Sequence, residues 1–498
     1  LLVFSKMGSM RQEPSPARPR PEALRGERTF VAECCETGKK RMKVLVIGGG
    51  GREHALCWKL ARSPRRPKVY CAPGNAGTAA VAENISCASD DAAGLLAFAQ
   101  AEHIDLTVVG PEGPLCAGIV DRFTGAGLRI FGPTAAAARL EGDKVYAKKL
   151  MREAGVPTAE ARVFEPTVQE LAQARESGKA FDGEPAPKVE TGYDMAHHYV
   201  STREEGVVVK AAGLAKGKGV FVHQDPSEAL LTLERLMLKG ELGEAGRRVV
   251  IEEILTGPEV SLLALVDGHS IYVLESAADH KRLGDGDTGP NTGGMGAYSP
   301  SGLLSPADLR TVERDVFVTI VDALRREGVE YRGVLYAGLI LTAGGPKVLE
   351  FNCRFGDPEA QPILMRLESD LIEALDATID GRLDQIELRW DPRAALCVVM
   401  ASAGYPGPYE TGRPITGIET ASALDAVEVF HAGTRHTEAG IVTSGGRVLG
   451  VTALGDSLVQ ARERAYEGIR HITFEGASVR EDIGLRVSEG ERAVPHDV

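Results

Sequence analysis

The sequence has few aromatic residues, no long apolar run and no excess of positive charge. Aromatic side chains make up 5% of the 498 residues. No apolar run reaches the length that spans a bilayer, which argues against a helical membrane protein. Acidic residues outnumber basic ones by 70 to 57, and the net charge of −13 argues against nucleic-acid binding as the primary role. An acidic chain can still bind anions through local basic pockets.

Cysteine is also scarce, with eight residues and no C-x-x-C pair, so the chain lacks the density of a disulfide scaffold. We predict reduced thiols in a cytoplasmic protein. Glycine is abundant by contrast, with 58 residues, many of them in clusters. Clustered glycines are typical of loops that bring the backbone close to a ligand. The length allows three or four domains with buried cores.

The first 42 residues differ from the rest of the chain. They mix Pro, Arg, Ser and Glu with little apolar periodicity, which predicts a disordered extension at 1–42. Five glutamates argue against a transit peptide, because such peptides are poor in acidic residues. Met42 directly precedes the first predicted strand and would be a natural initiator.

A buried parallel strand is predicted at 43–49, and a glycine-rich turn then enters a helix at Gly50–His54. The free N–H groups and the dipole of such a helix start favour an anion. The spacing does not fit a dinucleotide fingerprint, because Glu53 stands where the third glycine would be. Further strand–helix units continue to residue 132. The interval 43–143 is therefore predicted to be a doubly wound α/β domain.

A second glycine-rich stretch, Gly213–Val220, follows a predicted strand at 206–211. Three glycines and two lysines between two strands are suited to folding over a triphosphate. This is not a Walker A motif, because neither Ser nor Thr follows the lysine. A flexible basic hairpin loop is the alternative. The interval 166–190 is rich in Gly, Pro and charge and predicts a surface insertion.

Acidic residues end the next predicted strand, at 249–255. A strand that ends in Glu252 and Glu253 and runs into a short linker can offer backbone groups to an adenine edge. Glu259, beyond the linker, can accept hydrogen bonds from ribose hydroxyls. Taken alone, this stretch is equally well read as a solvated acidic turn.

The most specific stretch is Asp279–Pro300, a long polar run with six glycines. We predict that it lies outside the core and forms a functional loop, with a plain linker as the alternative. Asp, His, Lys and Arg stand in succession at its start, which a linker does not need. His280 has no partner histidine at metal-ligand spacing, so it stays unassigned.

A predicted strand at 346–352 carries polar residues at every second position near its end. Glu350, Asn352 and Arg354 therefore project to one side. A carboxylate and an amide oxygen suit Mg²⁺, and the guanidinium beyond them suits a phosphate or carboxylate. Metal, anion and positive charge at one strand end indicate phosphoryl transfer. An ordinary surface ion pair is the alternative, since Glu-x-Asn is a short pattern.

At these stretches the chain resembles the glycinamide ribonucleotide synthetase (phosphoribosylamine–glycine ligase) family of the ATP-grasp superfamily. The resemblance runs from Met42 to about Gly484, except for the interval 166–190. The matching blocks are Gly50–Ala55, Ala72–Thr78, Val109–Glu112, Gly213–Ala215 with Gly217–Val220, Asp279–Pro300 and Glu350–Glu359. The Asp279 and Glu350 blocks together are highly specific for this family within the superfamily.

The resemblance implies an α/β multidomain fold. Its parts are an N-terminal doubly wound (pre-ATP-grasp) domain at 43–143, a split ATP-grasp module at 144–385 and a small β-rich C-terminal domain at 390–490. The module would include a lid subdomain at about 156–255 that contains the insertion at 166–190.

The resemblance also implies roles for individual residues. The residues expected to bind ATP are Lys144, Lys210, Gly213, Gly217, Lys218, Gly219, Glu252, Glu253, Ile254 and Glu259. Those expected to contact phosphoribosylamine are Gly50, Gly51, Arg52, Glu53, Pro73, Gly74 and Asn75. Glu350 and Asn352 would hold Mg²⁺, or alternatively Mn²⁺. Asp279, Lys281 and Arg354 would be the catalytic residues that position glycine and the transferring phosphate.

The implied activity joins glycine to 5-phosphoribosylamine with hydrolysis of ATP to ADP and phosphate. Its product is glycinamide ribonucleotide, made through a glycyl phosphate intermediate in de novo purine (IMP) biosynthesis. The alternatives are another ATP-grasp carboxylate–amine ligase and a silent nucleotide-binding protein. The expected partners are the small-molecule substrates alone, without nucleic acid or membrane, and the expected state is a cytoplasmic monomer or weak homodimer. Three positions depart from the pattern of the family. Gly49 stands where an Asn is common, Ala212 where an Asp is common, and Lys216 where a small residue is common.

Overall fold

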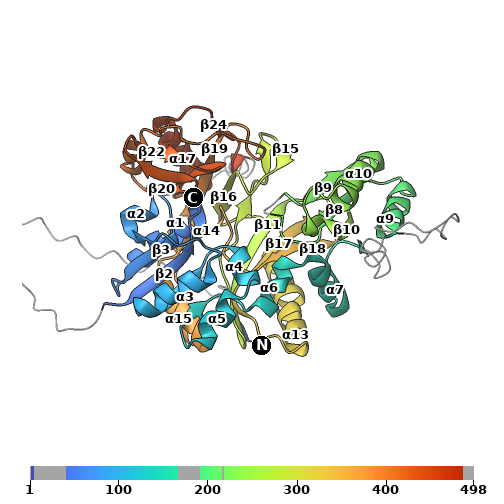
Figure 1. Cartoon of the computed structure of the whole chain (residues 1–498), viewed down its shortest axis with the longest axis horizontal. Helices are drawn as coiled ribbons and strands as arrows, with labels where there is room; N and C mark the ends of the chain where they lie inside the picture. The colour runs from blue at the N-terminus through green and yellow to red at the C-terminus, as the bar shows by residue number, and fades with distance from the viewer. Residues whose placement is uncertain (1, 5–40, 166–190, 216–217, 486–498) are drawn as a thin grey trace, which may run out of the picture.

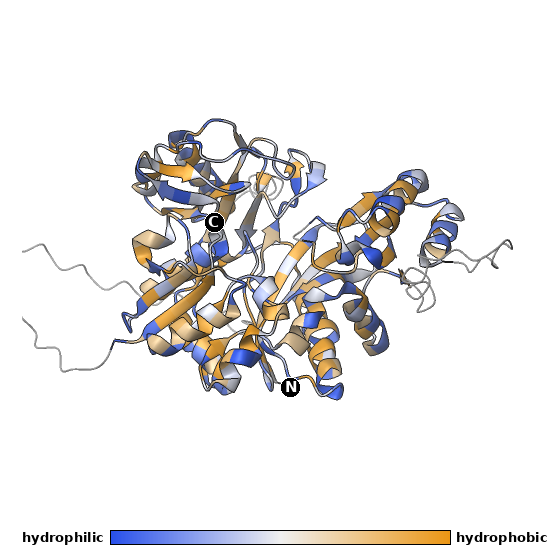
Figure 2. Ribbon diagram, viewed as in Figure 1, coloured by the Kyte–Doolittle hydropathy of each residue, from blue (hydrophilic) through white to orange (hydrophobic). Residues whose placement is uncertain are grey.

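The computed structural model describes residues 2–4, 41–165, 191–215 and 218–485, which form a mixed α/β structure (Figure 1). A parallel N-terminal sheet, two sheets of the central module and a C-terminal sheet each have their own buried cluster of apolar side chains, and a further cluster is shared by the N-terminal sheet and the central module. The strands carry much of this apolar surface (Figure 2). The predicted insertion at 166–190 lies outside the described residues. No helix within the described ranges is both long and apolar enough to cross a membrane.

The N-terminal sheet is parallel throughout, with strand order β4-β3-β2-β5-β6. Its central strand packs on both faces, since Val44 and Val46 belong to one apolar cluster and Leu45 and Ile47 to another. Helices therefore cover both faces, which confirms the predicted doubly wound fold. Its strands are β2 (Lys43–Gly48), β3 (Lys68–Pro73), β4 (Glu83–Asn84), β5 (Leu106–Val109) and β6 (Ile130–Phe131), and its main helices are α1 (Gly51–Ala61), α3 (Ala92–Ala101), α4 (Glu112–Cys116) and α5 (Ile119–Gly125).

The part of the chain that we expect to form the ATP-grasp module contains two separate sheets, in agreement with the predicted split architecture. The larger sheet has the order β1-β12-β11-β17-β18, and the smaller, which we call the lid sheet, has the order β7-β10-β8-β9. The larger comprises β11 (Glu259–Asp267), β12 (Ser270–Val273), β17 (Arg332–Thr342) and β18 (Gly345–Asn352), and the lid sheet β7 (Ala161–Phe164), β8 (Val207–Ala211), β9 (Val220–His223) and β10 (Val249–Glu253). The accompanying helices are α6 (Ala135–Gly142), α7 (Lys144–Ala154), α9 (Gly192–Ser201), α10 (Pro226–Leu233), α13 (Thr319–Arg326), α14 (Ala360–Arg366) and α15 (Leu371–Asp380).

Residues 2–4 differ from the predicted disordered extension. They form β1 (Leu2–Phe4), which pairs in parallel with β12 at the edge of the larger sheet. Val3 also packs against the apolar cluster of that sheet. The free edge of the sheet gains a backbone partner in this way, and the short apolar segment gains an apolar surface to pack on. The polar composition of the extension as a whole gives no sign of this strand. The residues from 5 to 40 lie outside the described ones.

The C-terminal sheet includes residues that we expected to form a loop outside the core. Its order is β13-β16-β19-β23-β20, and β24 pairs with β19. Both β13 (Ala278–Asp279) and β16 (Gly296–Ser299) come from the Asp279–Pro300 run or its immediate start, and Met295, Ala297 and Tyr298 are buried. The prediction for this part of the run was wrong, because the polar composition hides a short strand of small residues. The other strands are β19 (Ala394–Ser402), β20 (Val427–His431), β23 (Arg447–Gly455) and β24 (Ala477–Val479), and α17 (Leu458–His471) packs on the sheet.

Two histidines join the N-terminal and C-terminal parts. His54 in α1 and His431 in β20 are both buried, and their ring centroids are 5.5 Å apart. The backbone N–H of His431 donates to Nδ1 of His54 at 2.8 Å, and the Asn75 amide donates to the His431 carbonyl at 2.7 Å. Burial lowers the pKa of His54 to about 3 and that of His431 to about 4. The interface therefore requires neutral imidazole rings.

Replacing His54 with glutamine is expected to reduce the acid sensitivity of the fold. Below the ordinary pKa of 6.5 the unfolded chain binds a proton that folded His54 takes up only near pH 3, so stability falls as pH drops through this window. Between about pH 7.5 and pH 5 this amounts to about 2 kcal/mol for one histidine. Urea unfolding at both pH values measures this change in the free energy of unfolding. An equal acid-induced loss in the wild type and in His54→Gln would contradict the prediction.

Candidate functional site

The site is centred on the end of β18, where polar and buried residues alternate as predicted. Phe351 and Cys353 are buried, whereas Glu350, Asn352 and Arg354 are only partly covered. The antiparallel neighbour β17 fixes this register, with Glu350 opposite Gly338. The two oxygen-bearing side chains therefore share one face of the larger sheet. The strand β18 itself lies beside the lid sheet (Figure 1).

Three lysines surround Glu350. Lys281 Nζ lies 3.9 Å from its carboxylate, and Lys144 and Lys210 also act on it electrostatically. Burial alone would raise the pKa of Glu350, but these lysines hold it below its usual value, so the carboxylate is ionised. Lys144 stands at the start of α7 and donates to the carbonyl of Gly213 at 3.3 Å.

An ionised carboxylate and an amide oxygen fit a hard divalent cation such as Mg²⁺, which commonly takes its remaining ligands from phosphates and water. No cluster of three or more His, Cys, Asp or Glu side chains with metal-binding geometry occurs among the described residues, so the protein alone offers only part of a coordination sphere. The Asn352 oxygen accepts a long hydrogen bond of 3.3 Å from Arg354. A metal held by Glu350 and Asn352 would therefore lie next to the guanidinium.

Glu252, expected at the adenine site, points toward two lysines. Its carboxylate is 3% exposed and accepts Lys148 Nζ at 2.9 Å and Lys210 Nζ at 2.8 Å. Glu253 faces another way and pairs with Lys347 at 3.1 Å. Lys148 was not predicted as a site residue. Its spacing of four residues from Lys144 on one helix face is the signal that would have found it.

The glycine-rich stretch after β8 leads into the antiparallel strand β9, as the predicted strand–loop–strand arrangement requires. The Gly213 N–H donates to the Ala245 carbonyl at 3.1 Å, and Gly219 accepts from Ala211 at 2.8 Å. Lys218 is described and its N–H donates to Ala215. Lys216 and Gly217 lie outside the described residues. The loop is thus placed next to Lys144, which contacts Gly213.

A second polar group gathers behind Glu350. Lys281 pairs with Glu259 at 2.8 Å, so Glu259, expected at the ribose, contacts a residue expected to be catalytic. Burial raises the pKa of Asp279 to about 8 although Lys281 opposes this, and Asp279 Oδ1 has no hydrogen-bond partner within the described part of the chain. Glu359 accepts hydrogen bonds from Tyr336 and Ser261 nearby, and neither Tyr336 nor Ser261 was predicted.

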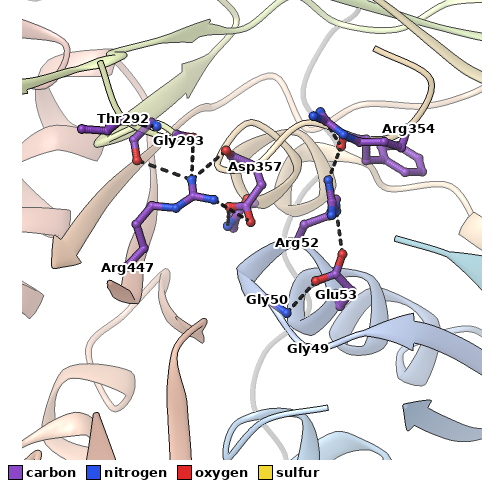
Figure 3. A network of polar contacts seen from close by, with 12 residues as sticks. Gly49, Gly50, Arg52, Glu53, Thr292, Gly293, Arg354, Asp357 and Arg447 are labelled. Atoms are coloured by element: carbon purple, nitrogen blue, oxygen red, sulfur yellow. Dashed lines mark hydrogen bonds and ion pairs between the residues drawn. The ribbon is translucent and has the colours of Figure 1, made fainter. Parts of the chain in front are cut away.

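The glycine turn before α1 is closed by Glu53. Its carboxylate accepts the Gly50 N–H at 2.6 Å and Arg52 Nε at 2.6 Å, and both side chains are buried (Figure 3). Arg52 then donates to the Phe355 carbonyl at 3.1 Å, next to Arg354. A methyl group at Gly110 would lie 2.1 Å from the Glu53 carboxylate, so a glycine is required there. Glu53 thus caps the turn, whereas we expected it to face the ligand.

The expected phosphoribosylamine residues of the second loop support the same turn. The Asn75 amide donates to the Gly49 carbonyl at 3.0 Å, and the Gly74 N–H donates to the Gly48 carbonyl at 3.1 Å. Pro73 ends β3 directly before them. The structure therefore brings Gly50, Gly51, Pro73 and Gly74 to one edge of the parallel sheet, where loops of this fold bind ligands.

The C-terminal part contributes Arg447, which was not predicted. Its guanidinium donates to the carbonyls of Gly293 at 2.6 Å and Asp357 at 2.8 Å, and pairs with the Asp357 carboxylate at 3.2 Å (Figure 3). Burial would raise the pKa of Asp357, but Arg447 and Arg52 hold it below its usual value. Arg447 thereby fixes the turn after β18 to the Asp279–Pro300 run and to β23.

Arg354 is held by two carboxylates from the N-terminal half of the chain. Its Nη2 lies 2.8 Å from Glu141, and its Nε lies 3.5 Å from Glu112 without hydrogen-bond geometry. Burial raises the pKa of Glu141 even though Arg354 opposes it. Glu112 and Glu141 were not predicted, although Glu112 stands in the conspicuous Pro111–Glu112 turn.

Sequence comparison covers the same three parts of the chain. The phosphoribosylglycinamide synthetase N domain matches residues 42–141, its ATP-grasp (A) domain residues 185–360 and its C domain residues 395–486. The chain belongs to the phosphoribosylglycinamide synthetase family. This confirms the resemblance that the Asp279 and Glu350 blocks indicated.

Relatives of this phosphoribosylglycinamide synthetase family align over nearly their whole length. A phosphoribosylamine–glycine ligase of Rhodopirellula baltica is 50% identical over 89% of this chain and 97% of its own. One of Allochromatium vinosum is 49% identical over 91% of this chain and all of its own. The crystal structure of the Thermotoga maritima phosphoribosylamine–glycine ligase superposes with a TM-score of 0.69 at 33% identity, over 89% of this chain and all of that one. A Hydrogenobacter thermophilus biotin carboxylase domain shares only the fold, at 15% identity and a TM-score of 0.63.

Of the three residues that depart from the family pattern, Gly49 and Ala212 lie within the described part of the chain. A side chain at Gly49 would lie 2.7 Å from the Gly74 carbonyl oxygen, so this chain packs its two N-terminal loops more closely than a side chain would allow. Ala212 is buried and its N–H donates to the Arg248 carbonyl at 3.0 Å. Lys216 lies outside the described residues.

Proposed function

We propose that this chain ligates glycine to 5-phosphoribosylamine, with ATP converted to ADP and phosphate, and thereby makes glycinamide ribonucleotide for purine biosynthesis. The observation that carries the proposal is the convergence on Glu350. Its ionised carboxylate, the Asn352 amide, three lysines and Arg354 meet beside a glycine-rich loop, and relatives at about half identity are phosphoribosylamine–glycine ligases. Positive charge around an oxygen-ligand pair suits a nucleoside triphosphate with its cation.

In the first step a glycine carboxylate oxygen attacks the γ-phosphorus of ATP, and the bond to ADP breaks, which leaves glycyl phosphate. In the second, the amine of phosphoribosylamine attacks the acyl carbon, phosphate leaves, and the nitrogen loses a proton. Lys144, Lys210 and Arg354 bind and orient the phosphates, while Asp279 and Lys281 position glycine. Mg²⁺ at Glu350 and Asn352 supplies charge neutralisation on the phosphates when bound. Both steps rely on orientation and charge, so no protein nucleophile is required.

The second substrate is assigned to the edge formed by Gly50, Gly51 and the loop Pro73–Asn75. The N-terminus of α1, an 11-residue helix, points its free N–H groups there and favours the 5′-phosphate. Arg52 and Glu53 act from behind, as the pair that holds the turn. Glu252, Glu253, Ile254 and Glu259, with Gly213, Gly217, Lys218 and Gly219, are assigned to the nucleotide. A cytoplasmic monomer or weak homodimer is the expected form.

Purified protein is expected to release ADP only when Mg-ATP, glycine and freshly generated phosphoribosylamine are all present. Omitting each component in turn, with glycinamide ribonucleotide detected by mass, tests this expectation. Release without glycine, or with another amino acid or amine in place of its proper substrate, would keep the ATP-grasp fold but assign a different ligase activity. Replacing Mg²⁺ by Mn²⁺ in the same assay determines which cation supports turnover.

A further inference from the structure

Lys148, Glu252 and Lys210 form a buried cluster of two positive charges and one negative charge between α7 and the lid sheet. One oxygen of Glu252 faces Lys148 at 2.9 Å and the other faces Lys210 at 2.8 Å. The three side chains are 9%, 3% and 8% exposed. A buried carboxylate that loses all its partners strongly destabilises the fold, so at least one of the lysines must stay with Glu252.

The two lysines differ in their other contacts. Lys148 Nζ is fixed by the Thr158 hydroxyl at 2.7 Å, and Thr158 itself donates to the Val348 carbonyl at 2.6 Å. Within the described part of the chain, Lys210 Nζ has one further hydrogen bond, to the Leu349 carbonyl at 3.0 Å. Lys210 also acts electrostatically on Glu350 and on Lys144, whereas Lys148 is coupled to Glu252, Lys210 and Glu253. Lys210 is thus the member that faces the proposed phosphate site, and Lys148 stays behind it.

We propose that Lys148 is a positioning residue for the nucleotide. It keeps Glu252 neutralised, so that Lys210 can turn from Glu252 to the polyphosphate of ATP. Without Lys148, Glu252 and Lys210 form a one-to-one buried pair, and moving Lys210 would leave a buried carboxylate alone. This inference deepens the proposed function and rests on its placement of ATP beside Lys210.

The cluster also connects the nucleotide to the proposed metal strand. Lys210 and Thr158 contact the carbonyls of Leu349 and Val348, which directly precede Glu350 in β18. Lys148 therefore acts on ATP only through Glu252 and Lys210, and not on glycine or phosphoribosylamine. We expect a variant at Lys148 to raise the KM for ATP and to leave the KM for glycine unchanged.

The test measures the Kd of Mg-ATP by calorimetry in the full-length protein, without glycine or phosphoribosylamine. Lys148→Met is expected to weaken ATP binding by about tenfold or more. Without Lys148, the move of Lys210 to ATP leaves the buried Glu252 carboxylate without a partner. Lys149→Met is the matched control, because Lys149 is the next residue of the same helix and is 65% exposed. It should bind ATP as the wild type does, within about twofold. Lys148→Gln is measured in parallel and should match Lys148→Met, because the charge and not the packing is decisive.

The deciding result is the effect of Lys148→Met in a Glu252→Gln background. A neutral residue at 252 no longer retains Lys210, so the second substitution should then change the Kd by less than about threefold. A merely structural role for Lys148 would give the same loss in both backgrounds and would overturn the proposal. So would wild-type affinity in Lys148→Met. Failure of the wild type itself to bind Mg-ATP would overturn the proposed function, and this inference with it.

Discussion

Replacing Glu350 with glutamine is expected to reduce ADP release by about a thousandfold or more, with the protein still folded. Glutamine keeps the shape of the glutamate side chain and one of its two oxygens, but it lacks the negative charge that would hold Mg²⁺. A bound metal contributes several kcal/mol to stabilising a phosphoryl transition state, and about 4 kcal/mol corresponds to three orders of magnitude. Lys281, Lys144 and Lys210 also face this carboxylate, so its loss removes part of the negative charge that balances them in the free enzyme.

The fold should survive because Glu350 is 36% exposed and its nearest cation, Lys281, keeps Glu259 as a closer partner. Steady-state assays across a range of Mg²⁺ concentrations, with thermal unfolding in parallel, measure both effects. Glu330→Gln is the control, since Glu330 is exposed and pairs only locally with Arg332 in the adjoining strand β17. Turnover of Glu350→Gln within about tenfold of the wild type would refute the metal assignment.

The sequence predicted the frame of the molecule well because its signals are local. The strand at 43–49 is a continuous apolar run, and α6 and α7 are separated at Asp143, whose side chain caps the start of α7. The alternation that exposes Glu350, Asn352 and Arg354 is equally local, since a strand has a period of two. These features depend on neighbours within a few residues, so one sequence is enough to find them.

Contacts between distant segments could not be predicted in the same way. Arg447 lies 90 residues from Asp357, and Glu141 lies 212 residues from Cys353. Nothing local to Arg447 distinguishes it from an exposed arginine after a Gly-Gly turn. The strand β16 was missed for a related reason, because one of the two strands that enclose it is β19, about 100 residues later. Glu252 shows a second limit, because a correctly placed strand says nothing about which groups its side chain meets.

Arg354 is expected to be essential for both turnover and stability, and the two effects can be separated. Arg354→Met removes the main partner of Glu141, whose side chain is only 7% exposed. Breaking a buried pair in this way costs about 3–5 kcal/mol, because the remaining charge stays buried. The same substitution removes the guanidinium next to Asn352, so activity should fall by about a thousandfold or more.

Adding Glu141→Gln to Arg354→Met should recover most of the stability and none of the activity. The glutamine carries no charge, and its amide oxygen can still accept the Cys353 N–H that Glu141 binds at 2.7 Å. Urea unfolding measures the first effect and ADP release the second. If activity returned together with stability, Arg354 would be a structural residue and its catalytic assignment would be wrong. If neither returned, the loss of stability would have a cause other than the unpaired Glu141. Recovery of stability alone would leave orientation of the transferring phosphate as the role of Arg354.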